Sequence, residues 1–89
     1  MKTVITTPPV DIALRTLDRD GLERVHAWFD HLRNWDGDET VRKNSHALKG
    51  MPDIYVLRTT SDIRIFFKIE GDTITILDVA KKQSILASG

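Results

Sequence analysis

The second half of the chain is dominated by apolar residues that alternate with polar ones. Three runs rich in β-branched and aromatic residues, 54–59, 63–69 and 73–79, are separated by the short polar segments TSD and EGD. In the middle run, Arg64, Phe66 and Lys68 fall on one face of a strand, and the isoleucines and Phe67 fall on the other. This pattern predicts consecutive antiparallel strands joined by tight turns.

Helical periodicity governs the first half of the chain. Lys2–Thr6 is a short β-prone segment that predicts an edge strand, and Pro8 and Pro9 predict a helix that starts after Thr7. A second helix, capped by an aspartate at 18 or 20, is predicted from apolar residues at spacings of three and four. Residues 41–49 carry a weak pattern that predicts a single helical turn.

The predicted fold class is α+β, with the element order β-α-α-β-β-β. We expect an antiparallel sheet with an N-terminal helical hairpin packed on one face. A chain of 89 residues has room for one core, so residues 1–89 are predicted to form a single domain.

Charge and composition exclude several classes of protein. The chain has 13 Lys and Arg against 13 Asp and Glu, which is not the basic balance typical of a nucleic-acid-binding protein. The charge is divided, however: residues 1–40 carry five basic and eight acidic groups, and residues 41–89 carry eight basic and five acidic groups. The absence of cysteine excludes disulfides and thiolate metal sites. No membrane span or signal-peptide pattern is present, so we expect a cytoplasmic protein without membrane contact.

Three segments, LKGMPDIYVLR, IRIFFKI and ILDVAKK, resemble the RelE/ParE superfamily of toxins from bacterial type II toxin–antitoxin pairs, and RelE most closely. The string at residues 48–55 is the most specific part of the resemblance. The resemblance implies a RelE-like fold over nearly the whole chain. It also implies a ribosome-dependent endoribonuclease that inhibits translation by making the 2′-hydroxyl of mRNA attack the adjacent phosphate, without a metal or other cofactor. The implied partners are a cognate antitoxin protein, the ribosome and mRNA.

The resemblance assigns roles to individual positions. Arg64 stands where these enzymes have an arginine that holds the scissile phosphate, and Arg58 stands where RelE has a strand lysine. Lys82 replaces an arginine that supports the transition state, keeping the charge without the planar fork. Two positions depart from the pattern: Val56 replaces a second strand lysine, and Ser88 replaces a tyrosine that stacks on a base.

Other candidate residues lie around these positions. His46 is a candidate catalytic base, because some relatives place a glutamate there and imidazole titrates near neutrality. The candidate RNA-binding residues are Lys81, Lys68 and Lys49. Without the resemblance, Lys81 and Lys82 are better explained as part of a plain polar C-terminus than as a phosphate site.

The loop after residue 58 decides whether the two strand arginines can act together. A two-residue loop would pair Arg58 with Ile65 and turn the arginines to opposite faces. An odd-numbered loop, such as residues 60–62, would place Arg58 directly across from Arg64 and bring Tyr55 onto the core side. Like charges facing each other are destabilising, so this register would favour a bound anion. The alternative is a pair of solvent-facing arginines neutralised by neighbouring aspartates.

Three functions therefore remain open. The first is an mRNA-cleaving toxin of RelE type. The second is a ParE-like inhibitor of DNA gyrase that catalyses nothing, which the missing tyrosine, the missing lysine and the neutral charge favour. The third is a decayed toxin that only binds its antitoxin. In each case we expect an antitoxin segment at the edge formed by Lys2–Thr6 or on the apolar surface of the short helices.

Overall fold

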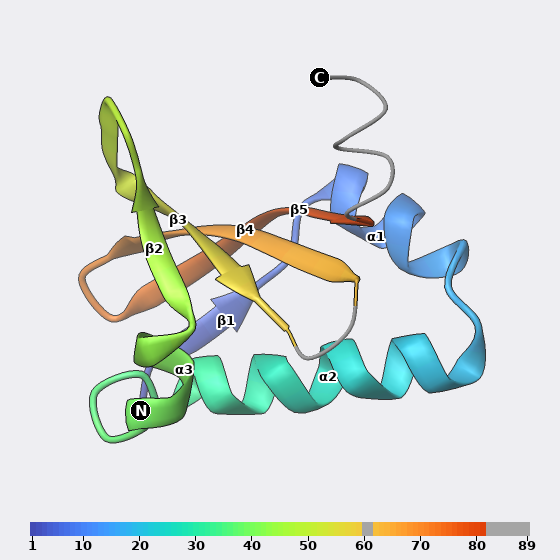
Figure 1. Ribbon diagram of the computed structural model, residues 1–89, viewed down its shortest axis with the longest axis horizontal. Coiled ribbons are helices and arrows are strands. Elements are labelled where there is room, and N and C mark those ends of the chain that lie inside the picture. Colours follow the sequence, from blue (N-terminus) through green and yellow to red (C-terminus); the bar gives the residue numbers. More distant parts are fainter. Residues whose placement is uncertain (60–61, 82–89) are drawn as a thin grey trace.

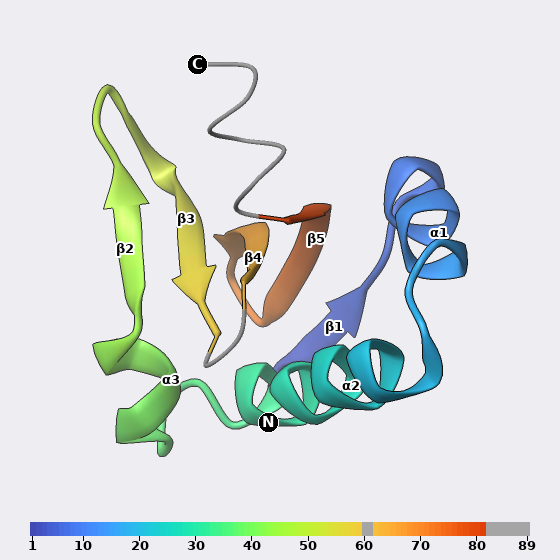
Figure 2. The ribbon, with the colours of Figure 1, turned by 45° about the vertical axis from the view of Figure 1, so that its right-hand side comes forward.

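The computed structural model describes residues 1–59 and 62–81. The elements within these residues are β1 (Thr3–Ile5), α1 (Pro8–Arg15), α2 (Arg19–Arg33), α3 (Glu39–Lys43), β2 (Ser45–Leu48), β3 (Met51–Arg58), β4 (Ile63–Glu70) and β5 (Thr73–Lys81). The predicted α+β class is confirmed, and α1 and α2 both lie on the same side of the sheet (Figures 1 and 2).

The strands form one sheet in the order β1-β5-β4-β3-β2. The β3, β4 and β5 strands pair antiparallel, as predicted, and β2 also pairs antiparallel with β3, whereas β1 joins the edge parallel to β5. The sheet is therefore mixed rather than wholly antiparallel. Because the whole rest of the fold separates β1 from β5, the connection is long enough for either direction, and alternation along a strand does not specify which is used.

Strand β2 was not predicted from the sequence, which indicated only a helical turn in this region. That turn is α3, and Ser45–Leu48 follows it as an additional edge strand paired with β3. The segment contains a serine, a histidine and an alanine, so it lacks the apolar alternation that marks a half-buried strand. Its strand conformation follows from pairing with β3, a tertiary effect that outweighs local propensity.

The two long helices begin where the sequence predicted. Pro8 occupies the first turn of α1, where its missing N–H leaves no hydrogen bond unmade. Asp18 caps α2, because its Oδ1 accepts a hydrogen bond from the Gly21 N–H at 2.7 Å. Apolar side chains of both helices then meet one face of the sheet. The buried core consists of Val10, Val25, Phe29, Leu32, Val41, Leu57, Ile63, Ile65, Phe67, Ile74, Ile76 and Val79.

An aromatic cluster fills the part of this core nearest the end of α2. Phe67 is fully buried and stacks on Tyr55, with ring centroids 5.5 Å apart and planes 13° apart. Trp35 meets both rings edge-on. Tyr55 is therefore on the core side of the sheet, as predicted.

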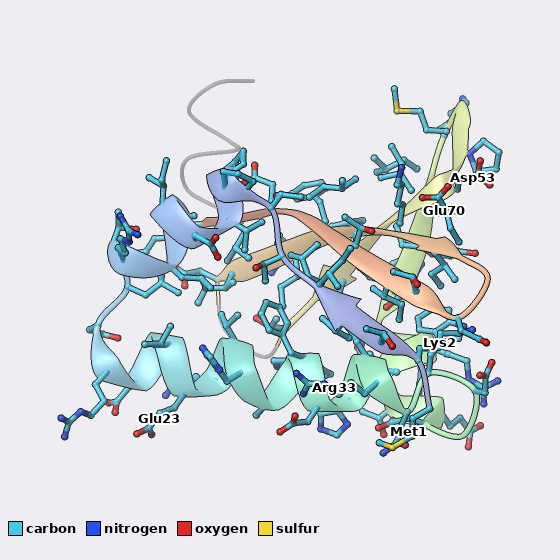
Figure 3. The ribbon with its side chains drawn as sticks, turned by 180° about the vertical axis from the view of Figure 1, so that it is seen from behind. Met1, Lys2, Glu23, Arg33, Asp53 and Glu70 are labelled. Carbon is cyan, nitrogen blue, oxygen red and sulfur yellow. The ribbon has the colours of Figure 1, made fainter. Side chains whose placement is uncertain are left out.

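The first residues of the chain are tied to the end of α2 and to the β4–β5 turn. The Lys2 N–H donates to the Arg33 carbonyl at 2.8 Å, and Lys2 Nζ donates to the Gly71 carbonyl at 3.0 Å. Figure 3 shows Lys2 and Arg33 near each other on this side of the molecule. These bonds hold β1 in place beside β5.

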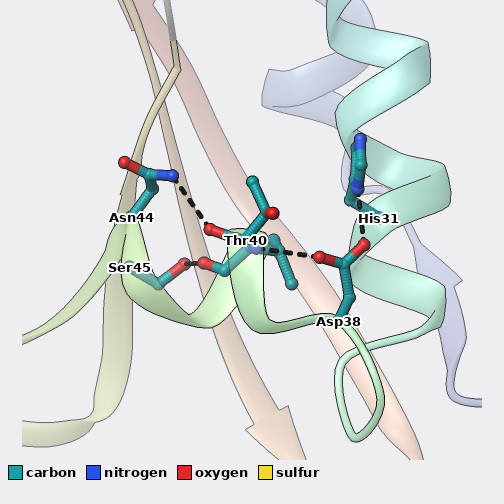
Figure 4. Close-up of polar contacts among 6 residues, drawn as sticks. His31, Asp38, Thr40, Asn44 and Ser45 are labelled. Atoms are coloured by element: carbon teal, nitrogen blue, oxygen red, sulfur yellow. Dashed lines mark hydrogen bonds and ion pairs between the residues drawn. The ribbon is translucent and has the colours of Figure 1, made fainter.

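A compact set of polar contacts joins α2, α3 and β2 (Figure 4). Asp38 caps α3 by accepting from the Val41 N–H at 3.1 Å, and its other oxygen lies 2.5 Å from His31 Nδ1. The hydrogen bond from His31 is the main reason that the pKa of Asp38 lies below its ordinary value of 3.8. Ser45 Oγ then donates to the Val41 carbonyl at 2.7 Å, which fixes the start of β2.

One irregularity in β5 changes which face its last residues occupy. The pairing of β4 with β5 shifts by one residue, so that Leu77 is left over as a β-bulge. Ile76 and Val79 are consequently both buried, although three positions separate them. A shift of one residue turns every later side chain to the opposite face. Lys81 therefore lies on the helix side of the sheet, paired across the ladder with the buried Ile63.

Candidate functional site

The face of the sheet that points away from α1 and α2 (Figure 2) is here called the outer face. It carries the polar half of the strand alternation. Cross-strand partners share a face of a sheet. One row of the outer face contains Val56, Phe66 and Asp78, which are successive partners on β3, β4 and β5. The next row contains Arg58 and Arg64.

Arg58 and Arg64 are direct partners in the β3–β4 ladder. The register predicted from an odd-numbered loop is thereby confirmed. Side chains at such positions have Cβ atoms roughly 4.5–5.5 Å apart. Arg58 is exposed, while Arg64 is partly buried and donates from Nη1 to the carbonyl of Ile63 at 3.1 Å. Two guanidinium-bearing side chains therefore share one small area of the outer face.

His46 belongs to the same area. It lies opposite Val56 in the β2–β3 pairing, so it is also on the outer face, and its side chain is exposed. The Arg58 N–H donates to the carbonyl of Asn44 at 2.9 Å, so Arg58 lies opposite Asn44, two residues along the strand pair from His46. His46 and Arg58 are thus diagonal neighbours, within roughly 7–8 Å of each other. We call His46, Arg58 and Arg64, together with Val56 and Phe66, the outer-face patch.

None of the three candidate RNA-binding lysines lies beside the arginine pair. Lys81 lies on the helix side, where it lines a pocket of about 360 Å³ between α1 and the end of β5. Lys68 is on the outer face but four residues from Arg64 along β4, roughly 13 Å away, and its Nζ lies 3.0 Å from a Glu70 oxygen. Lys49 is exposed in the β2–β3 turn, more than about 20 Å from Arg58 along β3.

The candidate Lys82 lies outside the described residues, as does Ser88, one of the two positions that depart from the family pattern. In residues 1–59 and 62–81, no group of three histidine, aspartate or glutamate side chains is placed to hold a metal ion. Within the same residues, no helix is long and apolar enough to cross a lipid bilayer.

Phe66 and Asp78 were not singled out as site residues from the sequence, although they lie beside the arginine pair. Asp78 is exposed, and one of its oxygens accepts a hydrogen bond from the Val79 N–H at 2.8 Å. The alternation of β4 already predicted Phe66 on the polar face, and this pattern could have identified it as a site residue. For Asp78 no such signal was available, because the bulge in β5 breaks the alternation and so changes the face on which Asp78 lies.

The arrangement of these elements defines a class of fold: a mixed sheet in the order 1-5-4-3-2, helices on one face and a partly basic second face. Solved structures of RelE toxins have this fold. A chain of the RelB–RelE antitoxin–toxin complex from Methanococcus jannaschii superposes with a TM-score of 0.75 and 19% identity, over 94% of this chain and 96% of that one. A chain of the intact Escherichia coli RelBE toxin–antitoxin complex superposes with a TM-score of 0.73 and 17% identity, over 91% of this chain and 96% of that one. The isolated E. coli RelE toxin superposes with a TM-score of 0.72 and 14% identity, over the full length of both chains.

The sequence itself matches no protein-family model. It is also not significantly similar to any curated protein. The structural likeness shows that the chain has the RelE-like fold, which confirms the fold predicted from its sequence.

Proposed function

We propose that this protein is the toxin of a type II toxin–antitoxin pair in the RelE/ParE superfamily. We propose further that it acts in the cytoplasm as a ribosome-dependent, metal-independent mRNA endoribonuclease. The observation that carries the second proposal is the direct pairing of Arg58 with Arg64 on the outer face of the sheet. Like charges in this position destabilise a strand pair, and a phosphate between them removes the repulsion.

The reaction would need three kinds of group. The 2′-oxygen of one nucleotide attacks the adjacent phosphorus, the bond to the 5′-oxygen of the next nucleotide breaks, and a cyclic phosphate remains. A base must take the proton of the 2′-hydroxyl, cations must stabilise the charge that develops on phosphorus, and an acid must protonate the leaving oxygen.

The patch offers groups for two of these roles. The planar fork of Arg64 suits a bidentate contact to the scissile phosphate, and Arg58 adds a second charge beside it. His46 is within reach of the same area and is the proposed base, since imidazole exchanges protons near neutral pH. The role proposed for Lys82 in supporting the transition state rests on the sequence alone.

The proposed partner is an antitoxin protein, because two of the structural neighbours are toxin–antitoxin complexes. The edge strand β1 and the adjacent α1 expose two large apolar side chains, Ile5 at 45% and Ile12 at 62%. An antitoxin segment could cover both by adding to this edge of the molecule as a strand or a helix. An acidic segment would also complement the basic second half of the chain.

Inducible expression with and without Arg64→Ala tests the ribonuclease. Loss of one charge-stabilising donor at a reaction centre slows catalysis by about 10²–10³-fold, so the variant should restore growth and remove the cuts in ribosome-bound mRNA. Primer extension maps those cuts. Arg24→Ala, an exposed arginine on α2 far from the patch, is the matched control and should behave as wild type. Growth arrest with uncut mRNA would contradict the proposal, as would cleavage that survives Arg64→Ala.

One observation favours a second function. Val56 lies on the outer face between the Arg58–Arg64 pair and Lys68. By the resemblance, RelE has a lysine at the position of Val56, so this chain has one cation fewer on the same face. A weaker cationic surface suits a ParE-like gyrase inhibitor. Gyrase-dependent DNA breaks and an SOS response on induction, without mRNA cuts, would support that function. Expression without any growth arrest would instead indicate a partner that only binds the antitoxin.

A further inference from the structure

Phe66 is an aromatic side chain without a place in the core. Its neighbour Phe67 is fully buried and stacks on Tyr55, whereas Phe66 points to the outer face and is partly exposed. In the described part of the chain, no ring-to-ring contact involves Phe66. The side chains next to it across the ladder are Val56 and Asp78. The ring therefore belongs to the outer face of the sheet and not to the buried core.

The charges around Phe66 are unequal. Arg64 is two residues earlier on the same strand and same face, roughly 7 Å away, with Arg58 directly across from it. On the other side, Lys68 has an ion pair with Glu70 at 3.0 Å. Two guanidinium groups thus lie at one end of this face and a single ammonium group at the other, so an anion next to Phe66 is attracted to the arginine end.

We propose that Phe66 is a stacking platform for one base of a single-stranded nucleic acid, whose neighbouring phosphate lies on the Arg58–Arg64 pair. Aromatic side chains on an open sheet suit this task, because every base has a π-face and unpaired bases can be splayed onto the ring. The carboxylate of Asp78, across the ladder from Phe66, repels phosphates and so keeps the backbone on the arginine side. The inference rests on the proposed function and gives the RNA a defined position on the sheet.

Binding of a short oligonucleotide to the purified full chain tests the platform. The probe is a fluorescein-labelled 2′-O-methyl RNA hexamer, which lacks the attacking hydroxyl and stays intact, and fluorescence anisotropy is followed over a series of KCl concentrations. Phe66→Leu should weaken binding by about 5- to 150-fold, the usual range for loss of one stacked base. Phe66→Trp should keep the affinity of wild type, and its added indole fluorescence should be quenched by the probe.

Salt dependence separates stacking from charge. Phe66→Leu should leave the slope of log K against log[salt] unchanged, whereas Arg64→Ala should reduce it by about 0.7, the value for one phosphate contact to a single strand. Phe29→Leu is the matched control: it makes the same chemical change in the buried core of α2 and should leave binding unchanged. Circular dichroism confirms that each variant is folded.

Several results would overturn the inference. If Phe66→Leu binds as wild type while Arg64→Ala weakens binding, the base lies elsewhere and the proposed ribonuclease remains. If the wild type does not bind the probe at low salt, the platform is wrong, and the primer-extension experiment with Arg64→Ala still decides the proposed function. If Phe66→Leu impairs only the binding of an acidic antitoxin peptide, the outer face is a protein interface instead.

Discussion

Replacing Arg58 with threonine should make the protein more stable while impairing the proposed cleavage. Arg58 faces Arg64 directly in the β3–β4 ladder. Two unit charges about 6 Å apart at a water-like dielectric repel by about 0.7 kcal/mol, which lies within the roughly 0.2–1 kcal/mol typical of cross-strand pairs. Threonine favours strands, and the backbone N–H at position 58 can still donate to the carbonyl of Asn44. The free energy of unfolding should therefore rise by about 0.5–1 kcal/mol at low ionic strength.

The gain should depend on salt because it comes from relief of repulsion. The Debye length is about 30 Å at 0.01 M salt but about 3 Å at 1 M, so the part of the difference that comes from charge repulsion should vanish at high salt, leaving only the contribution of strand propensity. Urea denaturation followed by tryptophan fluorescence at these two salt concentrations measures it. Lys68→Thr is the matched control on the same face. It removes an ion pair with Glu70 and should destabilise by about 0–1 kcal/mol, the opposite sign.

The reasoning fails if Arg58→Thr lowers stability at low salt. It also fails if a stability gain persists unchanged at 1 M salt, because the gain would then come from strand propensity rather than charge. If the prediction holds, the protein keeps a destabilising pair of charges on its outer face, as expected of a site built to hold an anion.

Two further outcomes follow from the fold. Phe67→Ala should destabilise by about 3–5 kcal/mol, because the ring is fully buried and stacked on Tyr55, and urea titration at neutral pH would show a shifted midpoint. Asp38→Ala should destabilise at neutral pH, since it removes the cap at Val41 and the contact with His31. The His31 hydrogen bond lowers the folded pKa of Asp38 below 3.8, so this stabilisation is present above about pH 4 and is lost as the pH falls through the folded value. Thermal melts of both proteins from pH 7 to pH 2 should therefore converge, and a difference that grows with acidity would contradict the assignment.

The sequence was informative where one periodic pattern coincided with one buried face. The alternation in β4 determined which of its side chains are buried, and it reduced the β3–β4 pairing to two registers, of which the structure has the one with Arg58 facing Arg64. The caps and proline positions likewise placed the starts of α1 and α2. These features depend on residues close together in the chain, so local rules suffice to predict them.

Other features depended on contacts between distant segments. The extra strand β2 forms because it can pair with the edge of β3. The strand β1 runs parallel to β5, although the long connection between them allows either orientation. The bulge at Leu77 is the feature with most effect on the candidate site. It lets Ile76 and Val79 share the core, and in doing so it sends Lys81 to the helix side, away from the outer-face patch.

The amino-acid sequence by itself thus determined the α+β class and the alternation of the central strand. It left two β3–β4 registers open, and the tertiary structure has the one in which Arg58 faces Arg64. Only the tertiary structure decided which charges share a face with them: His46 is brought beside Arg58 through β2, while Lys81 is turned away by the bulge in β5. The reason is that alternation specifies a face only relative to the preceding residue. The absolute face of each strand follows from the packing of its apolar side chains against a core that the whole chain builds together.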